Sequence, residues 1–386
     1  MIEIKPNNSY LSEKNGFLGK LKNSIINDIE KLIKNKNLLG NKVEKKSTEN
    51  KDIQKYVYSN DSGGNEKKQL IKCKLVEIKK EKEILIYLKD NLKKIIESEP
   101  KELLKIIEEI HTKFPDIKNN KSTNIYKIIY YIFVDKGYEA KISTTTDTSI
   151  AYKLVENLGI KTCPYCNRSY ISFIKTKKKK TRPQLDHFYP KAIYPFLACS
   201  FYNLIPSCSA CNHMKSDDDS FEDEKKGNLV HPYNVKDSDF TFSYTLNDLK
   251  ITEIFDTNKK DINFEYEESI GISLNTKYSK NNEYFQLQEI YQNHKDIVIE
   301  LILKEINYPK SYIDELIKNG FGTEEEIYRF IFSNYLEKDK LHQRPLSKLT
   351  RDIVEELGIL EKIVLVINEK WRFIKTTIFK TYSWYE

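Results

Sequence analysis

Two cysteine pairs constrain this chain more than any other feature. Cys163-Pro-Tyr-Cys166 and Cys208-Ser-Ala-Cys211 are separated by 41 residues. A two-residue spacer lets both sulfurs of a pair reach one ion, and two pairs supply the four thiolates of a tetrahedral zinc site. The segment 160–235 is rich in prolines and aromatic residues, as expected of a small core that a metal completes. We therefore expect structural Zn²⁺ on Cys163, Cys166, Cys208 and Cys211, with two unrelated knuckles or redox pairs as the alternatives.

The composition is typical of a soluble globular chain. Its 386 residues are 39% hydrophobic and 31% charged, and they exceed one ordinary domain. The longest apolar run has seven residues (128–134), far short of the roughly 20 that span a bilayer. Glu3 and Pro6 stand where a signal peptide needs an apolar core. We expect a cytoplasmic protein without a membrane partner, in which Cys73 and Cys199 are ordinary buried thiols.

Hydrophobic periodicity predicts the secondary structure of the flanks. Residues 1–150 repeat apolar side chains every three to four positions, which predicts helices, apart from a polar loop or linker at about 40–68. Period-two runs at Phe240–Tyr244 and Ile262–Tyr266 predict strands, and helical spacing resumes near Tyr284.

These patterns predict an α+β protein that is mostly helical. The expected regions are a helical N-terminal region (1–150) that regulates or binds a partner, a central metal-braced domain (155–235), and a mixed, then helical C-terminal region (236–386).

The charge is unevenly distributed. Residues 161–200 hold nine Lys or Arg against one acid, whereas residues 201–300 hold ten against nineteen. A basic segment beside an acidic flank indicates one part of the chain that meets a polyanion. The acidic run 217–224 lacks the spaced ligands and turn glycine of a calcium loop, so we expect a solvated surface there.

The segment between the cysteine pairs carries a second, more specific pattern. Leu185-Asp186-His187-Phe-Tyr-Pro190-Lys191 is followed by Asn203 and then by Cys208-Ser-Ala-Cys211-Asn212-His213-Met-Lys215. The order resembles the HNH, or ββα-metal finger, nuclease family, in the subgroup braced by a four-cysteine zinc site. The resemblance covers about residues 160–216 and implies a zinc-braced ββα nuclease domain within the central region.

The residue types suit phosphodiester hydrolysis independently of the family. Histidine is the natural base near neutral pH, because its ordinary pKa of about 6.5 leaves it largely neutral there. Asp186 can supply a hard oxygen ligand for Mg²⁺ or Mn²⁺, and an asparagine carbonyl can supply a neutral one. Neighbours on a strand point to opposite faces, so Asp186 and His187 can serve one site only where their strand ends or twists.

The resemblance implies a role for each matching residue. His187 matches the general base, Asp186 the acidic ligand of the catalytic cation, and Asn203 the asparagine that fixes the loop holding the base. Asn212 matches the third position and the second cation ligand, and a one-residue shift in helix register would place His213 there instead. Lys191 and Lys215 are candidate phosphate contacts.

A lysine run lies where a hairpin would precede the strand of Asp186. Lys178, Lys179 and Arg182 belong to this run and are further candidates for contacts to nucleic-acid phosphates. Such contacts would give affinity without sequence preference. A solvated loop is the alternative.

The predicted function is that of a metal-dependent HNH endonuclease acting on nucleic acid, with DNA favoured over RNA. The overall plan is also similar to bacterial HNH proteins of Septu-type anti-phage defence, which work beside a separate ATPase, so an ATPase is a candidate partner. The alternative is a non-catalytic, zinc-stabilised nucleic-acid-binding or scaffold protein.

Overall fold

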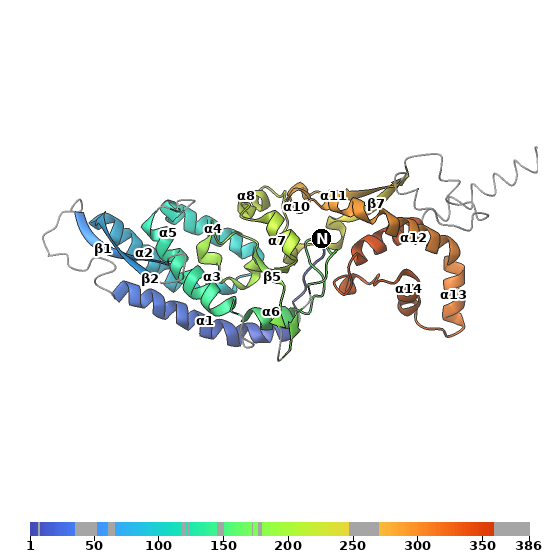
Figure 1. The fold of residues 1–386 in the computed structure, drawn as a ribbon, viewed down its shortest axis with the longest axis horizontal. Coiled ribbons are helices and arrows are strands. Elements are labelled where there is room, and N and C mark those ends of the chain that lie inside the picture. Colours follow the sequence, from blue (N-terminus) through green and yellow to red (C-terminus); the bar gives the residue numbers. More distant parts are fainter. Residues whose placement is uncertain are drawn as a thin grey trace, which may run out of the picture. The chain divides into compact units, whose positions relative to one another are not determined.

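The computed structural model describes two compact units (Figure 1). The N-terminal unit contains Glu3–Tyr165 and Ser169–Val235, and the C-terminal unit contains Met1–Ile2, Cys166–Arg168 and Lys236–Glu386. The described residues are 1–6, 8–34, 52–60, 66–117, 121, 123–144, 150–171, 173–176, 180–246 and 270–358. Within them helices predominate and the strands form two-stranded antiparallel sheets, in agreement with the predicted α+β class.

Helices form most of the N-terminal unit, as the apolar spacing predicts. They are α1 (Asn8–Lys34), α2 (Leu75–Asp90), α3 (Leu92–Glu97), α4 (Pro100–Lys113), α5 (Asn124–Tyr130), the π-helix η2 (Tyr131–Ile142) and α6 (Ile150–Leu158), with a short 3₁₀ turn η1 (Pro115–Ile117). In α4, Pro100 occupies the first turn, where a missing N–H needs no partner. The buried face of α4 consists of Leu103, Ile106, Ile107 and Ile110. Figure 1 shows α1 beside α2, α3 and α6.

Residues 52–74 depart from the sequence prediction. β1 (Asp52–Asn60) and β2 (Glu66–Lys74) pair antiparallel, with Asp52 opposite Lys74 and Asn60 opposite Glu66. The expected polar loop over 40–68 is therefore wrong for these strands. The abundance of Lys and Asn concealed a strand-favouring run, Tyr56-Val57-Tyr58. The turn sequence Asp61–Gly64 lies outside the described residues.

The π-helix η2 approaches the segment around Cys199 closely. A Cβ on Gly137 would lie 2.6 Å from the Cys199 sulfur, so no side chain fits at this position. The Cys199 thiol donates to the Phe133 carbonyl at 3.1 Å, and burial raises its pKa. The prediction of a buried thiol at Cys199 is confirmed, whereas the side chain of Cys73 lies outside the description.

The region that follows Cys163 contains a strand pair and a helix in the order β–β–α. The elements are β3 (Ile174–Lys175), β4 (Lys180–Thr181), β5 (Gln184–His187), η3 (Pro195–Leu197), η4 (Phe201–Asn203), β6 (Leu204–Ser207), α7 (Ser209–Lys215), α8 (Ser220–Lys225) and η5 (Pro232–Asn234). β3 and β4 form the hairpin expected at the lysine run. β5 pairs antiparallel with β6, and α7 follows β6 after Cys208.

The C-terminal unit combines one hairpin with several helices. Its elements are η6 (Asp237–Asp239), β7 (Thr241–Leu246), β8 (Ile270–Asn275), α10 (Ser279–Phe285), α11 (Leu287–Tyr291), η8 (Gln292–His294), α12 (Lys295–Asn307), α13 (Lys310–Lys318), α14 (Glu324–Phe332), η9 (Lys338–Lys340) and a helix over residues 347–358. Phe242, Tyr291, Ile302 and Ile353 lie in its core. The strand predicted at Phe240–Tyr244 is confirmed by β7, and the one predicted at Ile262–Tyr266 falls outside the described residues.

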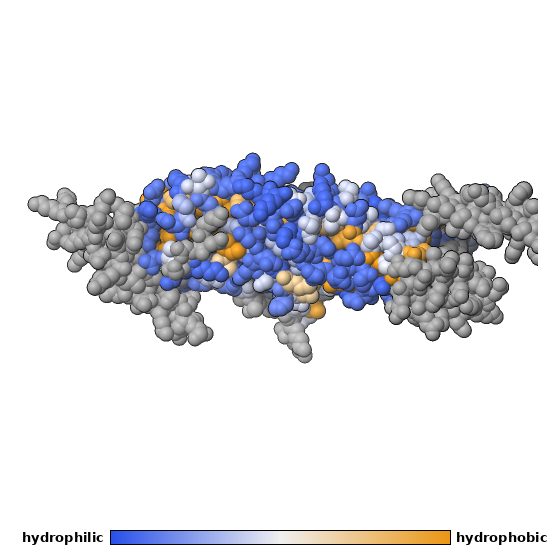
Figure 2. Space-filling model, turned by 90° about the horizontal axis from the view of Figure 1, so that it is seen from above, coloured by the Kyte–Doolittle hydropathy of each residue, from blue (hydrophilic) through white to orange (hydrophobic). Residues whose placement is uncertain are grey.

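Few large apolar side chains are exposed within the described ranges. Figure 2 shows mostly hydrophilic residues on the face in view, with hydrophobic residues in limited areas. Among the residues that the structure describes, the most exposed large apolar side chains are Phe330, at 87%, and Phe321, at 74%. A search of the described helices finds none that is both long and apolar enough to span a bilayer.

Candidate metal and active site

The four paired cysteines converge in space. The sulfurs of Cys163, Cys166, Cys208 and Cys211 all lie within 4.8 Å of one another. Backbone N–H groups point at two of these sulfurs, from Arg168 to Cys166 at 3.4 Å and from Cys211 to Cys208 at 3.5 Å. Donors of this kind stabilise thiolates. The four cysteines could therefore bind a metal such as zinc, as the spacing predicts.

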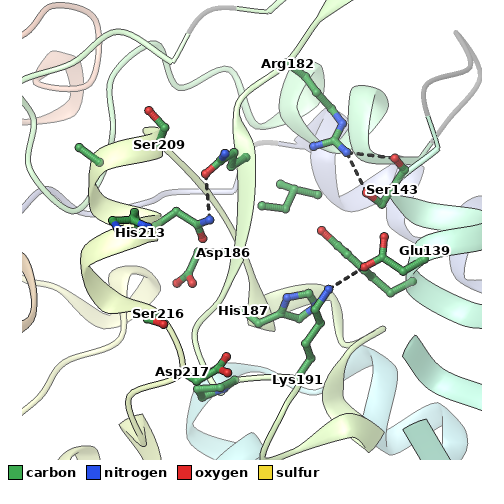
Figure 3. A pocket seen from close by; sticks show the side chains of 16 residues that line it. Glu139, Ser143, Arg182, Asp186, His187, Lys191, Ser209, His213, Ser216 and Asp217 are labelled. Atoms are coloured by element: carbon green, nitrogen blue, oxygen red, sulfur yellow. Dashed lines mark hydrogen bonds and ion pairs between the residues drawn. The ribbon is translucent and has the colours of Figure 1, made fainter. Parts of the chain in front are cut away.

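Asp186 and His187 stand at the end of β5, opposite Ile205 and Leu204 of β6. Figure 3 shows their side chains leaving the strand on different sides, Asp186 toward α7 and His187 toward Lys191. Both nevertheless line the same cavity of about 850 Å³, because the strand stops at His187. The expectation that they could share a site only at a strand end fits this geometry.

The Asp186 carboxylate is almost fully buried and is held from two sides. The Tyr165 hydroxyl donates to its Oδ2 at 2.5 Å, and the Lys215 ammonium lies 3.5 Å from its Oδ1. Asp186 is 4% exposed, while Tyr165 and Lys215 have no exposed surface. Burial, together with the nearby Asp186 charge, raises the pKa of Tyr165 well above its usual value, so the phenol stays a donor.

His187 is oriented by a backbone carbonyl. Its Nε2 lies 3.0 Å from the Ala198 oxygen, which can only accept, so Nε2 carries the proton and Nδ1 carries the lone pair. The Tyr138 ring packs edge-on against the imidazole at 4.4 Å between centroids. Burial, followed by the nearby Lys191 charge, lowers the pKa of His187 to about 3. The ring is therefore neutral at physiological pH, with its lone pair on Nδ1.

Asn203 ties the loop after His187 to the start of β6. Its Oδ1 accepts from the Tyr189 N–H at 2.7 Å, and its Nδ2 donates to the carbonyls of Tyr189 and Leu197 at 3.0 and 3.1 Å. The side chain is completely buried, so these bonds account for its polar atoms. This bracing is what the resemblance implies for Asn203.

Asn212 and His213 both line the cavity from α7. The Asn212 amide donates to Gln184 Oε1 at 2.8 Å, which ties α7 to β5 and fixes the amide orientation. Asn212 is half-buried and His213 is exposed. Because the hydrogen bond to Gln184 fixes its amide, Asn212 is the preferred oxygen donor, and His213 remains the alternative ligand.

The carboxylate of Asp186 and the amide oxygen of Asn212 are donors suited to a hard divalent cation. Each carboxylate oxygen has a second lone pair beyond its present contact. Mg²⁺ binds through one or two such protein oxygens and keeps several waters, for which a cavity of this size has room. Asp186 and Asn212 therefore supply oxygen donors of the type that hard divalent cations take.

Of the predicted phosphate contacts, Lys191 and Arg182 line the cavity, and each is already bound to another residue. Lys191 lines the cavity and pairs with Glu139 at 2.6 Å. Arg182 also lines it and donates to the carbonyl and hydroxyl of Ser143 at 3.2 and 3.1 Å. Lys178 and Lys179 lie outside the described residues.

Lys215 requires a correction. It has no exposed surface, and its ammonium donates to the His187 carbonyl at 2.9 Å beside Asp186. A side chain in this position cannot contact a phosphate in the cavity. Its place at the last turn of α7 directs it under β5, so it neutralises buried charge instead.

A second tyrosine–carboxylate pair lies in the same unit. The Tyr189 hydroxyl donates to Glu224 Oε2 at 2.5 Å, and burial raises the pKa of Glu224 to about 7. Nearby, Asp219 caps α8 and accepts from the Tyr194 hydroxyl at 2.6 Å. The acidic run 217–224 is therefore partly structural, which corrects the expectation of a solvated surface.

Several residues of the site gave no signal in the sequence. Tyr138, Glu139 and Ser143 form a wall of the cavity from η2 and the residue after it, roughly 45 positions before His187 in the chain. Tyr165 lies between the two cysteines of a pair, and in such a motif the sequence signal is the spacing of the cysteines alone. No local pattern connects these positions, because tertiary packing alone brings them together.

Comparison with known proteins adds no relative. No family model, no curated protein and no solved structure matches this chain. The interpretation of the site therefore depends on its own geometry.

Proposed function

We propose that this protein is a metal-dependent endonuclease of the HNH type that hydrolyses phosphodiester bonds in nucleic acid. One observation carries the proposal. A neutral histidine with its Nε2 fixed on a carbonyl and a buried carboxylate line one cavity at the end of a β–β–α unit. The cluster of four cysteines beside this unit fits a structural zinc ion.

The mechanism assigns each chemical task to a residue. His187 Nδ1 accepts a proton from the attacking water, and the bond from Nε2 to Ala198 keeps the ring in the required tautomer. Asp186 and Asn212 would hold the divalent cation, and the hydrogen bond to Gln184 orients the Asn212 amide. When bound, the cation supplies charge stabilisation at the leaving oxygen. Asn203 fixes the loop that follows the base.

Substrate binding is assigned to the two basic residues Arg182 and Lys191, which we call the rim of the cavity. Arg182 and Lys191 line the cavity, and contacts from them to backbone phosphates would carry no sequence information. Glu139 shares the Lys191 ammonium and lowers its attraction for phosphate until the polyanion competes for it. DNA is the favoured substrate over RNA. Anti-phage defence beside an ATPase partner completes the proposal and is supported only by the family resemblance.

The test compares His187, which lines the cavity, with a histidine that does not. Full-length His187→Ala is expected to lose cleavage of supercoiled DNA in Mg²⁺ or Mn²⁺ by about 1,000-fold or more, because it removes the base. Its zinc content and circular dichroism should stay unchanged. His342→Ala is the matched control and is expected to cleave within about three-fold of the unmodified protein, since His342 is half-buried and does not line the cavity. Full cleavage by His187→Ala would contradict the mechanism.

The alternative is a zinc-stabilised nucleic-acid-binding module without catalysis. It uses the same cysteines and rim cations but gives Asp186 and His187 structural roles. DNA or RNA binding with no cleavage in any divalent cation, alone or with a partner ATPase, would favour this alternative over the nuclease.

A further inference from the structure

Tyr165 occupies a position that neither the cysteine spacing nor the proposed catalysis explains. It stands between Cys163 and Cys166, has no exposed surface and does not line the cavity. Its hydroxyl nevertheless reaches Asp186 Oδ2 at 2.5 Å. One residue therefore connects the backbone of a cysteine pair with the acidic side chain of the cavity.

The backbone that carries Tyr165 is itself fixed by a tight turn. The Cys163 N–H donates to the Ser169 carbonyl at 3.0 Å, and the Ile171 N–H donates to the Lys161 carbonyl at 2.9 Å. Thr162 and Tyr170 form a bridge in the same turn. A metal held by Cys163 and Cys166 would lock the two residues that flank Tyr165, and so the direction of its phenol.

The phenol opposes the pull of Lys215 on the carboxylate. Lys215 lies 3.5 Å from Oδ1, and its shorter contact is the 2.9 Å bond to the His187 carbonyl. With Tyr165 in place, Oδ2 is anchored and Oδ1 is only loosely approached. Without the phenol, the buried carboxylate would lose a hydrogen bond and would turn toward the only ammonium beside it in the described residues.

We propose that Tyr165 is a positioning residue that orients Asp186 for the divalent cation and couples this orientation to occupancy of the four-cysteine cluster. The inference rests on the assignment of Asp186 as a cation ligand under the proposed function. Tyr165 does not touch substrate, and its effect passes entirely through the carboxylate. Metal in the cysteine cluster thereby controls the affinity of the cavity for a second cation.

The direct test is a pair of tyrosine-to-phenylalanine variants. Tyr165→Phe and Tyr189→Phe each remove one buried hydroxyl that donates to a carboxylate at 2.5 Å, but only Asp186 lines the cavity. Mn²⁺ binding to the zinc-loaded, full-length proteins is measured by electron paramagnetic resonance. Tyr165→Phe is expected to bind Mn²⁺ about 10- to 100-fold more weakly with unchanged zinc content, because outer ligand contacts have effects of this size. Tyr189→Phe should bind like the unmodified protein.

Equal Mn²⁺ affinity of Tyr165→Phe and the unmodified protein would overturn the inference. Asp186→Asn identifies the Mn²⁺ signal that belongs to the cavity, since this variant must lose it. If the unmodified protein binds Mn²⁺ through Asp186 but cleaves no nucleic acid, the proposed nuclease function fails. The inference about Tyr165 is then still tested by the Mn²⁺ affinities of Tyr165→Phe and the unmodified protein. If cleavage occurs, Tyr165→Phe should recover part of the lost rate at high Mn²⁺, which a merely structural defect would not do.

A second measurement needs no variant that could misfold. Cobalt substituted for zinc in the unmodified protein gives a thiolate absorption that reports on the cysteine cluster. Because coupling between two sites is reciprocal in binding free energy, Mg²⁺ added over the range that displaces Mn²⁺ from the cavity should raise the affinity of the cluster for cobalt, measured by this absorption in competition with a chelator. An affinity of the cluster for cobalt that is unchanged at saturating Mg²⁺ would overturn the proposed coupling, whatever the behaviour of Tyr165→Phe.

Discussion

Two buried tyrosines in the N-terminal unit make the same hydrogen bond in different surroundings. Tyr165 donates to Asp186 and Tyr189 donates to Glu224, both at 2.5 Å. Asp186 lines the cavity beside His187 and has Lys215 next to it, whereas Glu224 does not line the cavity. A buried tyrosine–carboxylate bond is thus not by itself a functional site. Access to a cavity that His187 also lines distinguishes the Asp186 region from the Glu224 region.

The two regions should differ most in their dependence on the cysteine cluster. Cys211→Ser is expected to lose bound zinc and to lower the free energy of unfolding by roughly 3 kcal/mol or more, because metal binding is coupled to folding of such a core. Hydrogen exchange followed by mass spectrometry should show a larger increase over the unmodified protein in β5, β6 and α7, around Asp186, than in α8, which carries Glu224.

The matched control is Cys199→Ser, which changes a buried thiol outside the cluster. It should keep its zinc and lose only about 1 kcal/mol, the scale of one weakened hydrogen bond and a small packing change. If Cys211→Ser and Cys199→Ser lose the same zinc content and the same free energy of unfolding, the distinction between clustered and ordinary cysteines is wrong.

The next largest effect separates the two carboxylates directly. Asp186→Asn should weaken Mn²⁺ binding by about 100-fold, because a charged hard ligand becomes a neutral one. Glu224→Gln should bind Mn²⁺ normally. Isothermal titration of both variants with Mn²⁺ measures the difference, and a strong loss in Glu224→Gln would show that the cavity is not the site.

Glu224 should instead reveal itself in the pH dependence of stability. Its folded pKa of about 7 lies above the ordinary value of 4.5, so the folded state holds the proton more tightly. The stabilisation is complete below pH 4.5 and is lost as the pH rises through 7. Glu224→Gln should therefore gain stability relative to the unmodified protein over this range, on the order of 2 kcal/mol, allowing for partial exposure. Urea unfolding at pH 4.5 and pH 8 measures the difference, and parallel profiles would contradict it.

The smallest effect concerns the rim of the cavity. Lys191→Ala should weaken DNA binding several-fold and reduce its dependence on log salt concentration by about one unit, as for one lost phosphate contact. Lys225→Ala is the control. Lys225, on α8, does not line the cavity, and its Nζ lies 2.7 Å from Oε1 of Glu108 on α4. Fluorescence anisotropy at several salt concentrations compares them. An identical salt dependence in both would exclude Lys191 from substrate binding.

The sequence was informative where the evidence is local. The two-residue spacing of the cysteines predicts the cluster because each pair closes through a single turn. Asp186 and His187 are adjacent, so their common place at a strand end could be inferred from Pro190 soon after. Asn203 was expected to brace a loop, and its bonds to Tyr189 and Leu197 do so.

The sequence was uninformative or misleading where distant segments meet. Tyr165 and Asp186 are 21 positions apart, and Lys215 and Asp186 are 29 apart, so no spacing rule connects them. Lysine is usually a surface residue, which made a phosphate contact the natural expectation for Lys215. Only the packing of α7 beneath β5 shows that the Lys215 ammonium is buried beside the Asp186 carboxylate. The hairpin β1–β2 was missed because its composition resembles that of a polar linker.

The most direct test of two distinct metal sites is a crystal structure of the full chain soaked in Mn²⁺, with anomalous maps at the zinc and manganese edges. The account predicts a zinc peak among the four cysteines. It also predicts a separate manganese peak at about 2.1 Å from an Asp186 oxygen, with Asn212 nearby. A cavity without manganese at Asp186, while the cation binds elsewhere in a protein that cleaves nucleic acid, would contradict the account.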